Sequence, residues 1–234
     1  AYLAENLATW GYTSFSVSQD QLMMRQDNPK GKGMHQRRRL IAAALDALGA
    51  ANAGTLADGP SVTEGISEIL EGKLDMTRIG LMGHSRGGDA VTSFIDYNRQ
   101  RTDGPRYPLR GVIALAPVDY ERKAPYGTPF MSILPFCDGD VSNLQGARFF
   151  ERSQYINGAD PFPRVQSSQL GTNHNWYNTV WYADGGADGQ NNNDAACGNS
   201  APFATTNVHP NNLRLSGAAD PTVPAKNYVI DNSD

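Results

Sequence analysis

The chain has 234 residues, a formal net charge of -4 and only 19% charged residues. This length suffices for one α/β domain with a large core, so we predict a single domain over residues 1–234. The acidic balance disfavours nucleic-acid binding, and we expect the one basic cluster, Arg37 to Arg39, to form the solvated start of a helix. No apolar run approaches the roughly 18 residues of a membrane span, which predicts that no segment crosses a membrane.

Apolar periodicity predicts strands and helices that alternate along the chain. The predicted strands cover residues 12–17, 79–82, 111–116, 130–136 and 165–170. The predicted helices cover residues 1–10, 36–48 and 62–70, a stretch that starts after Gly88, and residues 143–155. Such alternation is typical of an α/β fold with a mostly parallel sheet and helices on both faces. Residues 183–234 are rich in Gly, Asn and Pro and lack periodicity, so we predict a loop-rich tail.

The most informative stretch runs from residue 78 to residue 91, where an apolar run precedes a serine between glycines and then a helical pattern. Gly83, Ser85 and Gly87 form a G-x-S-x-G pattern in this setting. The pattern is typical of a nucleophile elbow, in which a strained turn exposes the serine hydroxyl above the sheet. A tight glycine turn in another kind of α/β protein is the alternative. We predict that Ser85 is a catalytic nucleophile.

A serine nucleophile requires a base within hydrogen-bond reach, and an acid that orients this base. His174 lies well downstream of Ser85 near a predicted strand end, so we predict that it is the base. We expect His84, inside the elbow, to point away from the serine and to serve packing. His35 and His209 lie in a polar loop and in the irregular tail, where surface positions are expected.

The acid has three candidates that follow predicted strands. Asp138 and Asp140 come after the strand at residues 130–136, and Asp119 comes after the strand at residues 111–116. The carboxyl edge of a parallel sheet is where such proteins place ligands and catalytic groups. We predict Asp140 as the acid, with Asp138 next and Asp119 third. Turn formation or helix capping is the expected role of the remaining two.

Three further features lie near these positions. Cys137 and Cys197 fit one disulfide as well as two buried thiols; we predict the disulfide, which would close a loop of about 60 residues and contribute roughly 4 kcal/mol. Trp176 and Tyr177, beside the predicted base, fit either a substrate pocket or packing under a loop. Residues 184–194 look like a calcium loop but lack its terminal glutamate, so we predict a solvated loop, with no metal and no other cofactor.

Three motifs resemble the α/β-hydrolase superfamily: Gly-His-Ser-Arg-Gly-Gly at 83–88, Cys-Asp-Gly-Asp at 137–140 and Gly-Thr-Asn-His at 171–174. Within it they resemble secreted bacterial esterases of the lipase, cutinase and polyester-hydrolase group, and the elbow also resembles that of chlorophyllases. The resemblance covers residues 1–181. It implies a serine carboxylic ester hydrolase that acts through an acyl-enzyme, with Ser85 attacking, His174 moving the proton and Asp140 holding the imidazole. It also implies that the backbone N–H of Arg86 is one oxyanion donor.

The chain departs from the family pattern at both ends. The family has several strands before the helix with which this chain opens, and a loop there supplies the second oxyanion N–H. After Ser216 the family continues with a helix, which Pro221 and Pro224 oppose here. We therefore expect an α/β-hydrolase fold without its first strands, whose sheet a preceding polypeptide segment completes.

These observations predict a secreted serine esterase that acts on a small-molecule or polymeric ester. Many Asn, Gly, Ser and Thr residues with few lysines favour an extracellular protein. An amide or peptide hydrolase with the same triad is one alternative, because the nucleophile does not fix the acyl substituent. A non-catalytic α/β-hydrolase-like binding module is the other, motivated by the absent first strands.

Overall fold

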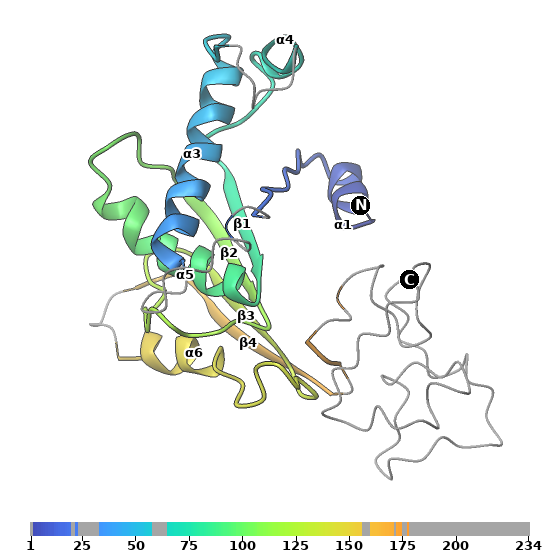
Figure 1. Cartoon of the computed structure of the whole chain (residues 1–234), viewed down its shortest axis with the longest axis vertical. Helices are drawn as coiled ribbons and strands as arrows, with labels where there is room; N and C mark the ends of the chain where they lie inside the picture. The colour runs from blue at the N-terminus through green and yellow to red at the C-terminus, as the bar shows by residue number, and fades with distance from the viewer. Residues whose placement is uncertain are drawn as a thin grey trace, which may run out of the picture.

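The computed structural model describes residues 2–19, 22, 33–57, 65–155, 160–170, 172–174 and 177, and Figure 1 shows their arrangement. The elements, in chain order, are α1 (Tyr2–Thr9), α3 (Met34–Asn52), α4 (Ile66–Leu70), β1 (Ile79–His84), α5 (Arg86–Gln100), β2 (Leu109–Leu115), β3 (Phe130–Pro135), α6 (Ala147–Ser153) and β4 (Arg164–Gln169). From β1 onward, α5 follows β1 and α6 follows β3, while β2 and β3 are joined without a helix between them. The predicted α/β character is confirmed.

The strands form one parallel sheet in the order β1-β2-β3-β4. Each strand therefore lies beside its neighbour in the chain, and all four carboxyl ends meet at one edge. Apolar stretches such as Val112 to Leu115 suit these strands, because parallel strands are buried between layers and read as continuous hydrophobic runs. The predicted parallel sheet is confirmed within the described residues.

The helices that pack on the sheet, α5 and α6, lie on the same face. The rings of Phe149 in α6 and Phe130 in β3 pack edge to face, with their centroids 6.0 Å apart. Both residues belong to one buried cluster with Val91 and Phe94 of α5. α3 packs against α5 and so adds a further layer on this side (Figure 1). Among the described residues, helices pack on only one face of the sheet, so the prediction of helices on both faces is not confirmed. The reason is topological: right-handed crossovers that always step to the next strand place their helices on one side.

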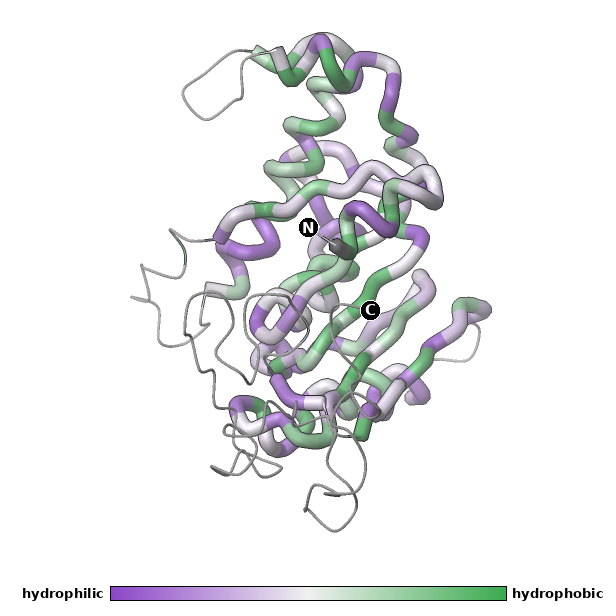
Figure 2. The backbone as a smooth tube through the Cα atoms, turned by 90° about the vertical axis from the view of Figure 1, so that its right-hand side faces the viewer, coloured by the Kyte–Doolittle hydropathy of each residue, from purple (hydrophilic) through white to green (hydrophobic). Residues whose placement is uncertain are grey.

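The opposite face of the sheet carries an apolar row. Met82, Ile113, Met131 and Val165 are register partners across all four strands. Met82 and Val165 are each 46% exposed. Figure 2 looks toward this side of the sheet and shows hydrophobic segments along the strands. Among the described residues, α5 covers one face of β1, while Met82 on the other face stays exposed.

Three predicted elements differ from the structure. Residues 12–17 form no strand; they lie exposed without a partner strand among the described residues, and β propensity is realised only when a strand is paired and packed. The helix predicted at 143–155 is shorter and begins at Ala147, because turns precede it and Leu144 has a φ of 46°. The predicted helix at 36–48 is longer, running over Met34–Asn52.

The basic cluster at the start of α3 is only partly solvated. Arg39 is exposed, as predicted. Arg37 is only 3% exposed and hydrogen-bonds to Gln19, and Arg38 pairs with Glu121 at 2.6 Å. The prediction of a solvated cluster is therefore wrong for two of the three arginines, because α3 turns these two toward the rest of the fold.

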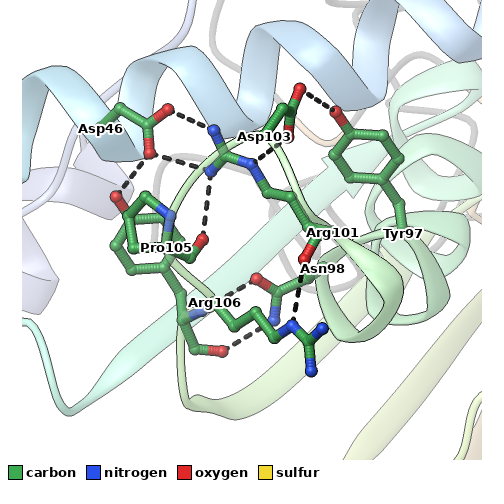
Figure 3. A network of polar contacts seen from close by, with 8 residues as sticks. Asp46, Tyr97, Asn98, Arg101, Asp103, Pro105 and Arg106 are labelled. Atoms are coloured by element: carbon green, nitrogen blue, oxygen red, sulfur yellow. Dashed lines mark hydrogen bonds and ion pairs between the residues drawn. The ribbon is translucent and has the colours of Figure 1, made fainter.

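A polar network at the C-terminal end of α5 fixes this helix against α3 and the loop before β2 (Figure 3). The guanidinium of Arg101, whose side chain is buried, binds both oxygens of Asp46 at 2.8 and 2.5 Å and donates from Nε to Asp103 at 2.8 Å. The side-chain amide of Asn98 bonds to both the N–H and the carbonyl of Tyr107. Such a bidentate pair restricts orientation as well as distance. The helix that starts at the elbow is thereby held at its far end.

Candidate active site

Ser85 lies at the junction of β1 and α5 in a conformation that a non-glycine residue rarely adopts. Its φ is 56° and its ψ is -121°. Its N–H donates to the carbonyl of Leu115 at 2.9 Å, so the serine continues the pairing of β1 with β2 before the chain turns. Its side chain makes no capping hydrogen bond to α5. Backbone strain of this kind costs about 1–3 kcal/mol and is concentrated at functional sites.

Two glycines permit the close approach of β1 and α5 at this turn. A Cβ on Gly83 would lie 2.1 Å from the carbonyl oxygen of Gly87, and one on Gly88 would lie 2.7 Å from Cβ of Pro117. Gly87 has open space at the corresponding position. Gly87 belongs to the G-x-S-x-G pattern, but its neighbour Gly88 is the position where packing leaves no room for a side chain.

Gly83→Ala is therefore expected to destabilise the protein by about 3 kcal/mol or more, because the clash is with backbone that cannot rotate away. Gly87→Ala is the matched control and is expected to be neutral or to stabilise by about 0.5–1 kcal/mol, since alanine is the better helix residue. Urea unfolding of both variants measures this difference. Equal effects of the two substitutions would contradict the close approach at Gly83.

The loops after β3 and β4 are joined by main-chain hydrogen bonds that extend the sheet ladder. Phe136 donates to the carbonyl of Gln169 at 2.9 Å, and Cys137 donates to that of Thr172 at 2.9 Å. Asp138 is the next residue in the first loop, and His174 lies two residues beyond Thr172 in the second. The ladder therefore brings these two side chains together at the carboxyl edge of the sheet.

His174 and Asp138 form a buried pair. Nδ1 of His174 lies 2.9 Å from Oδ2 of Asp138, and the Asp138 side chain is 1% exposed. The other oxygen of Asp138 accepts the N–H of Val141 at 2.5 Å. A carboxylate at Nδ1 fixes the ring orientation and leaves Nε2 for chemistry. Asp138, the second choice from the sequence, therefore has the position of an orienting acid.

Asp140, the first choice, lies elsewhere on the same ring. Its Oδ2 is 3.3 Å from Nε2 of His174, and its side chain is 68% exposed. The difference has a local cause: the N–H of Asp138 bonds back to the carbonyl of Pro135 at 3.3 Å, and this turn directs Asp138 inward while Asp140 remains at the surface. Asp140 therefore faces Nε2 of His174, and Asp138 faces Nδ1.

Asp119, the third candidate, is engaged by α6. Its two oxygens bind the guanidinium of Arg152 at 2.8 and 2.5 Å, and its backbone N–H donates to Gln145. This bidentate ion pair is a structural contact between the loop after β2 and α6. It places Asp119 in a different cluster from the His174 pair.

His84 has a larger part in the site than the sequence indicated. Its Nε2 donates to the backbone carbonyl of His174 at 2.7 Å, and the two rings lie 4.6 Å apart at 46°. Burial, and to a lesser degree the proximity of His174, lowers the pKa of His84 and so favours the neutral ring. Because His84 directly precedes Ser85, it links the serine strand to the loop that carries His174. Only the tertiary contact reveals this role, since a histidine inside a turn carries no sequence signal for it.

Arg86 and Tyr177 are two other predicted site residues that the structure describes. Arg86 is the first residue of α5, so its N–H has no acceptor within the helix and is a suitable oxyanion donor. The Tyr177 hydroxyl lies 2.8 Å from Oε1 of Gln169 and 2.9 Å from Oγ1 of Thr172, and burial raises the pKa of this phenol to about 12. Tyr177 thus supports the loop before His174.

Cys137 is buried. The disulfide and the solvated loop stay predictions, because part or all of each lies outside the described residues. The positions outside them are residue 171, Trp176, residues 184–194, Cys197 and His209.

A buried carboxyl lies one turn beyond the serine on α5. Asp89 is fully buried, and its Oδ2 accepts the N–H groups of Tyr120 and Glu121 at 2.9 and 3.2 Å. Its Oδ1 has no hydrogen-bond partner among the described residues. Burial raises the pKa of Asp89 to about 7, although the two N–H groups act in the opposite direction. Asp89 fastens the loop after β2 to the helix that begins at Ser85.

The raised pKa of Asp89 predicts a pH-dependent stability. The folded state holds this proton more tightly than the unfolded state, so stability is present below pH 4 and is lost as the pH rises through about 7. The loss is on the order of 4 kcal/mol. Asp89→Asn removes this titration, and urea unfolding at pH 5 and pH 8 is expected to show a smaller decrease for the variant. An unchanged decrease would mean that Asp89 does not titrate in this range.

Comparison of the chain with protein-family models and with curated proteins finds no match. Among the described residues no helix has the length and apolar character needed to cross a membrane, and no group of His, Cys, Asp and Glu side chains is arranged to hold a metal ion.

Proposed function

We propose that this chain is a serine hydrolase that cleaves carboxylic esters through an acyl-enzyme. Ser85 is the nucleophile, His174 the general base and acid, and Asp138 the residue that orients the imidazole. The observation that carries the proposal is the buried 2.9 Å contact between His174 Nδ1 and Asp138. Ser85 is held at positive φ and directly follows His84, whose ring bonds to the carbonyl of His174. The chain order Ser85, Asp138, His174 is that of α/β-hydrolases.

In the acylation step, Nε2 of His174 takes the proton of the Ser85 hydroxyl while Oγ bonds to the ester carbonyl carbon. The carbonyl oxygen becomes an oxyanion, to which the N–H of Arg86 donates. The imidazolium is stabilised by Asp138 at Nδ1. The tetrahedral intermediate then collapses: the bond to the alkoxy oxygen breaks, and the leaving alcohol takes the proton from Nε2.

In the deacylation step, a water molecule gives a proton to Nε2 of His174 and bonds to the acyl carbon. The second intermediate collapses with loss of Ser85 Oγ, which recovers the proton. The carboxylic acid leaves, and the site returns to its starting state. No metal or organic cofactor enters this scheme, since the serine supplies the nucleophile and the histidine both proton transfers.

The resemblance of the three motifs to secreted esterases supports ester substrates over amides. Secretion, and action on polymeric as well as small esters, are parts of the same proposal. Support for secretion comes from the composition and from the pairing that we predict between Cys137 and Cys197, since disulfides persist in oxidising compartments.

The test combines a fluorophosphonate probe with a p-nitrophenyl ester. Covalent labelling at Ser85, located by peptide mass spectrometry, together with release of p-nitrophenol is the expected result. The same chain denatured before addition of the probe is the control, because labelling must depend on the folded site. Absence of both labelling and turnover from the folded protein would favour a non-catalytic binding module.

A further inference from the structure

His174 has a carboxylate at each ring nitrogen. Asp138 lies at Nδ1 at 2.9 Å, and Asp140 lies at Nε2 at 3.3 Å. The proposed mechanism uses only the first of these contacts. The second places a carboxylate 3.3 Å from the nitrogen that must accept the proton of Ser85, so it has no place in the reaction as written.

The two carboxylates differ in how firmly they are held. Asp138 is buried and its second oxygen is fixed by the N–H of Val141. Asp140 is 68% exposed and follows Gly139, so water can replace its contact with the imidazole. The contact at Nδ1 is thus shielded from solvent, whereas water or ions can compete with Asp140 for the contact at Nε2.

The chemistry of the ring defines when the second contact forms. A carboxylate accepts hydrogen bonds and donates none, so Asp140 can bond to Nε2 only when this nitrogen carries a proton. In the neutral ring with its proton on Nδ1, the lone pair of Nε2 would face the carboxylate. The arrangement with both contacts is therefore one in which His174 cannot take a proton from Ser85.

The other titratable ring beside His174 does not offset this arrangement. The ring centroid of His84 lies 4.6 Å from that of His174, and burial lowers the pKa of His84, which disfavours a second positive charge there. Two carboxylates, those of Asp138 and Asp140, therefore face the imidazole.

We propose that Asp140 competes with Ser85 for Nε2 of His174 and holds the site in a latent arrangement, which becomes active when the Asp140 carboxylate is displaced. This inference rests on the proposed function and adds a means of regulating it. Ions in solution, or a bound substrate that covers Nε2, are the agents that displace an exposed carboxylate. Asp140 is a regulatory residue in this scheme and takes no part in bond making.

The test compares wild type, Asp140→Ala and a matched control, Glu151→Gln, which removes one negative charge from an exposed position on α6. The rate of fluorophosphonate labelling at low salt is expected to be about two- to fivefold higher in Asp140→Ala, the range for loss of an exposed ion pair. In wild type and in Glu151→Gln the rate should rise toward that value near 1 M salt, where the Debye length is about 3 Å. Asp140→Ala should show little salt dependence.

Two results would overturn the inference. Slower labelling of Asp140→Ala would mean that Asp140 assists His174, as an orienting acid does. Equal rates and equal salt dependence in all three proteins would mean that the contact has no effect on the site.

A spectroscopic measurement separates this inference from the proposed function. The ¹H–¹⁵N spectrum of the His174 ring at low salt should show a hydrogen-bonded proton on Nε2 in wild type and in Glu151→Gln, and its loss in Asp140→Ala, with the Nδ1 proton retained. If wild type fails to label but the spectra behave in this way, the hydrolase proposal fails and the contact stands. Identical spectra in the three proteins would refute the contact itself.

Discussion

Replacement of Ser85 by alanine is expected to lower kcat by about 10⁶-fold, the loss seen when a nucleophile that acts as a unit with its base is removed. The substitution deletes one oxygen at the turn and leaves φ and the backbone bond to Leu115 in place. The fold should therefore be unchanged by circular dichroism, while ester turnover and probe labelling both disappear.

Ser142→Ala is the matched control for this experiment, because it makes the same chemical change at an exposed serine in the loop after β3. Its kcat should equal that of wild type. Turnover that persists in Ser85→Ala, or probe attached to another serine, would place the nucleophile elsewhere.

The same position also permits a test of backbone strain. Glycine adopts positive φ at no steric cost, so Ser85→Gly should be as inactive as Ser85→Ala but more stable to urea by about 0.5–1 kcal/mol. This gain would show that the serine is held in an unfavourable conformation. A glycine variant that is less stable than the alanine variant would indicate that the turn is relaxed.

Asp138→Asn is expected to lower kcat by about 10⁴-fold, because an amide at Nδ1 can neither stabilise the imidazolium nor hold the required tautomer. The loss should appear in kcat, with KM little changed, since Asp138 acts through His174 and not on the substrate. Steady-state kinetics on a p-nitrophenyl ester measure this effect.

The contrast with Asp140 makes this prediction specific. Asp140→Asn removes the same charge two residues away, but from the surface and from the other ring nitrogen. Its kcat should remain at or above that of wild type. A greater loss in Asp140→Asn than in Asp138→Asn would restore Asp140 as the acid, as the sequence first suggested.

Much of the secondary structure could be predicted from local patterns. The strands β1, β2 and β3 are largely apolar and are bounded by Gly, Pro or polar residues, and α3 and α5 carry apolar stripes at helical spacing. Residues 12–17 have the same alternation as a strand but no partner among the described residues. Local pattern reports the propensity of a segment, whereas a strand exists only where another strand accepts its hydrogen bonds.

The candidate site could likewise be predicted only in part from the sequence. Ser85 and His174 could be nominated from the sequence, because the G-x-S-x-G pattern depends on a local turn and because few histidines follow it. The choice between Asp138 and Asp140 could not, since the two are separated by one glycine and differ only in which of them the turn after β3 directs inward.

The sequence by itself determined the elements with local causes: the parallel strands, the helices between them, and the strained serine between glycines. The tertiary structure alone decided which side chains meet. It placed Asp138 at Nδ1 and Asp140 at Nε2 of His174, joined His84 to the carbonyl of His174, and committed Asp119 to Arg152. These contacts join residues 33 to 90 positions apart in the chain. No local pattern encodes them, because they depend on how the ends of parallel strands are brought to one edge of the sheet.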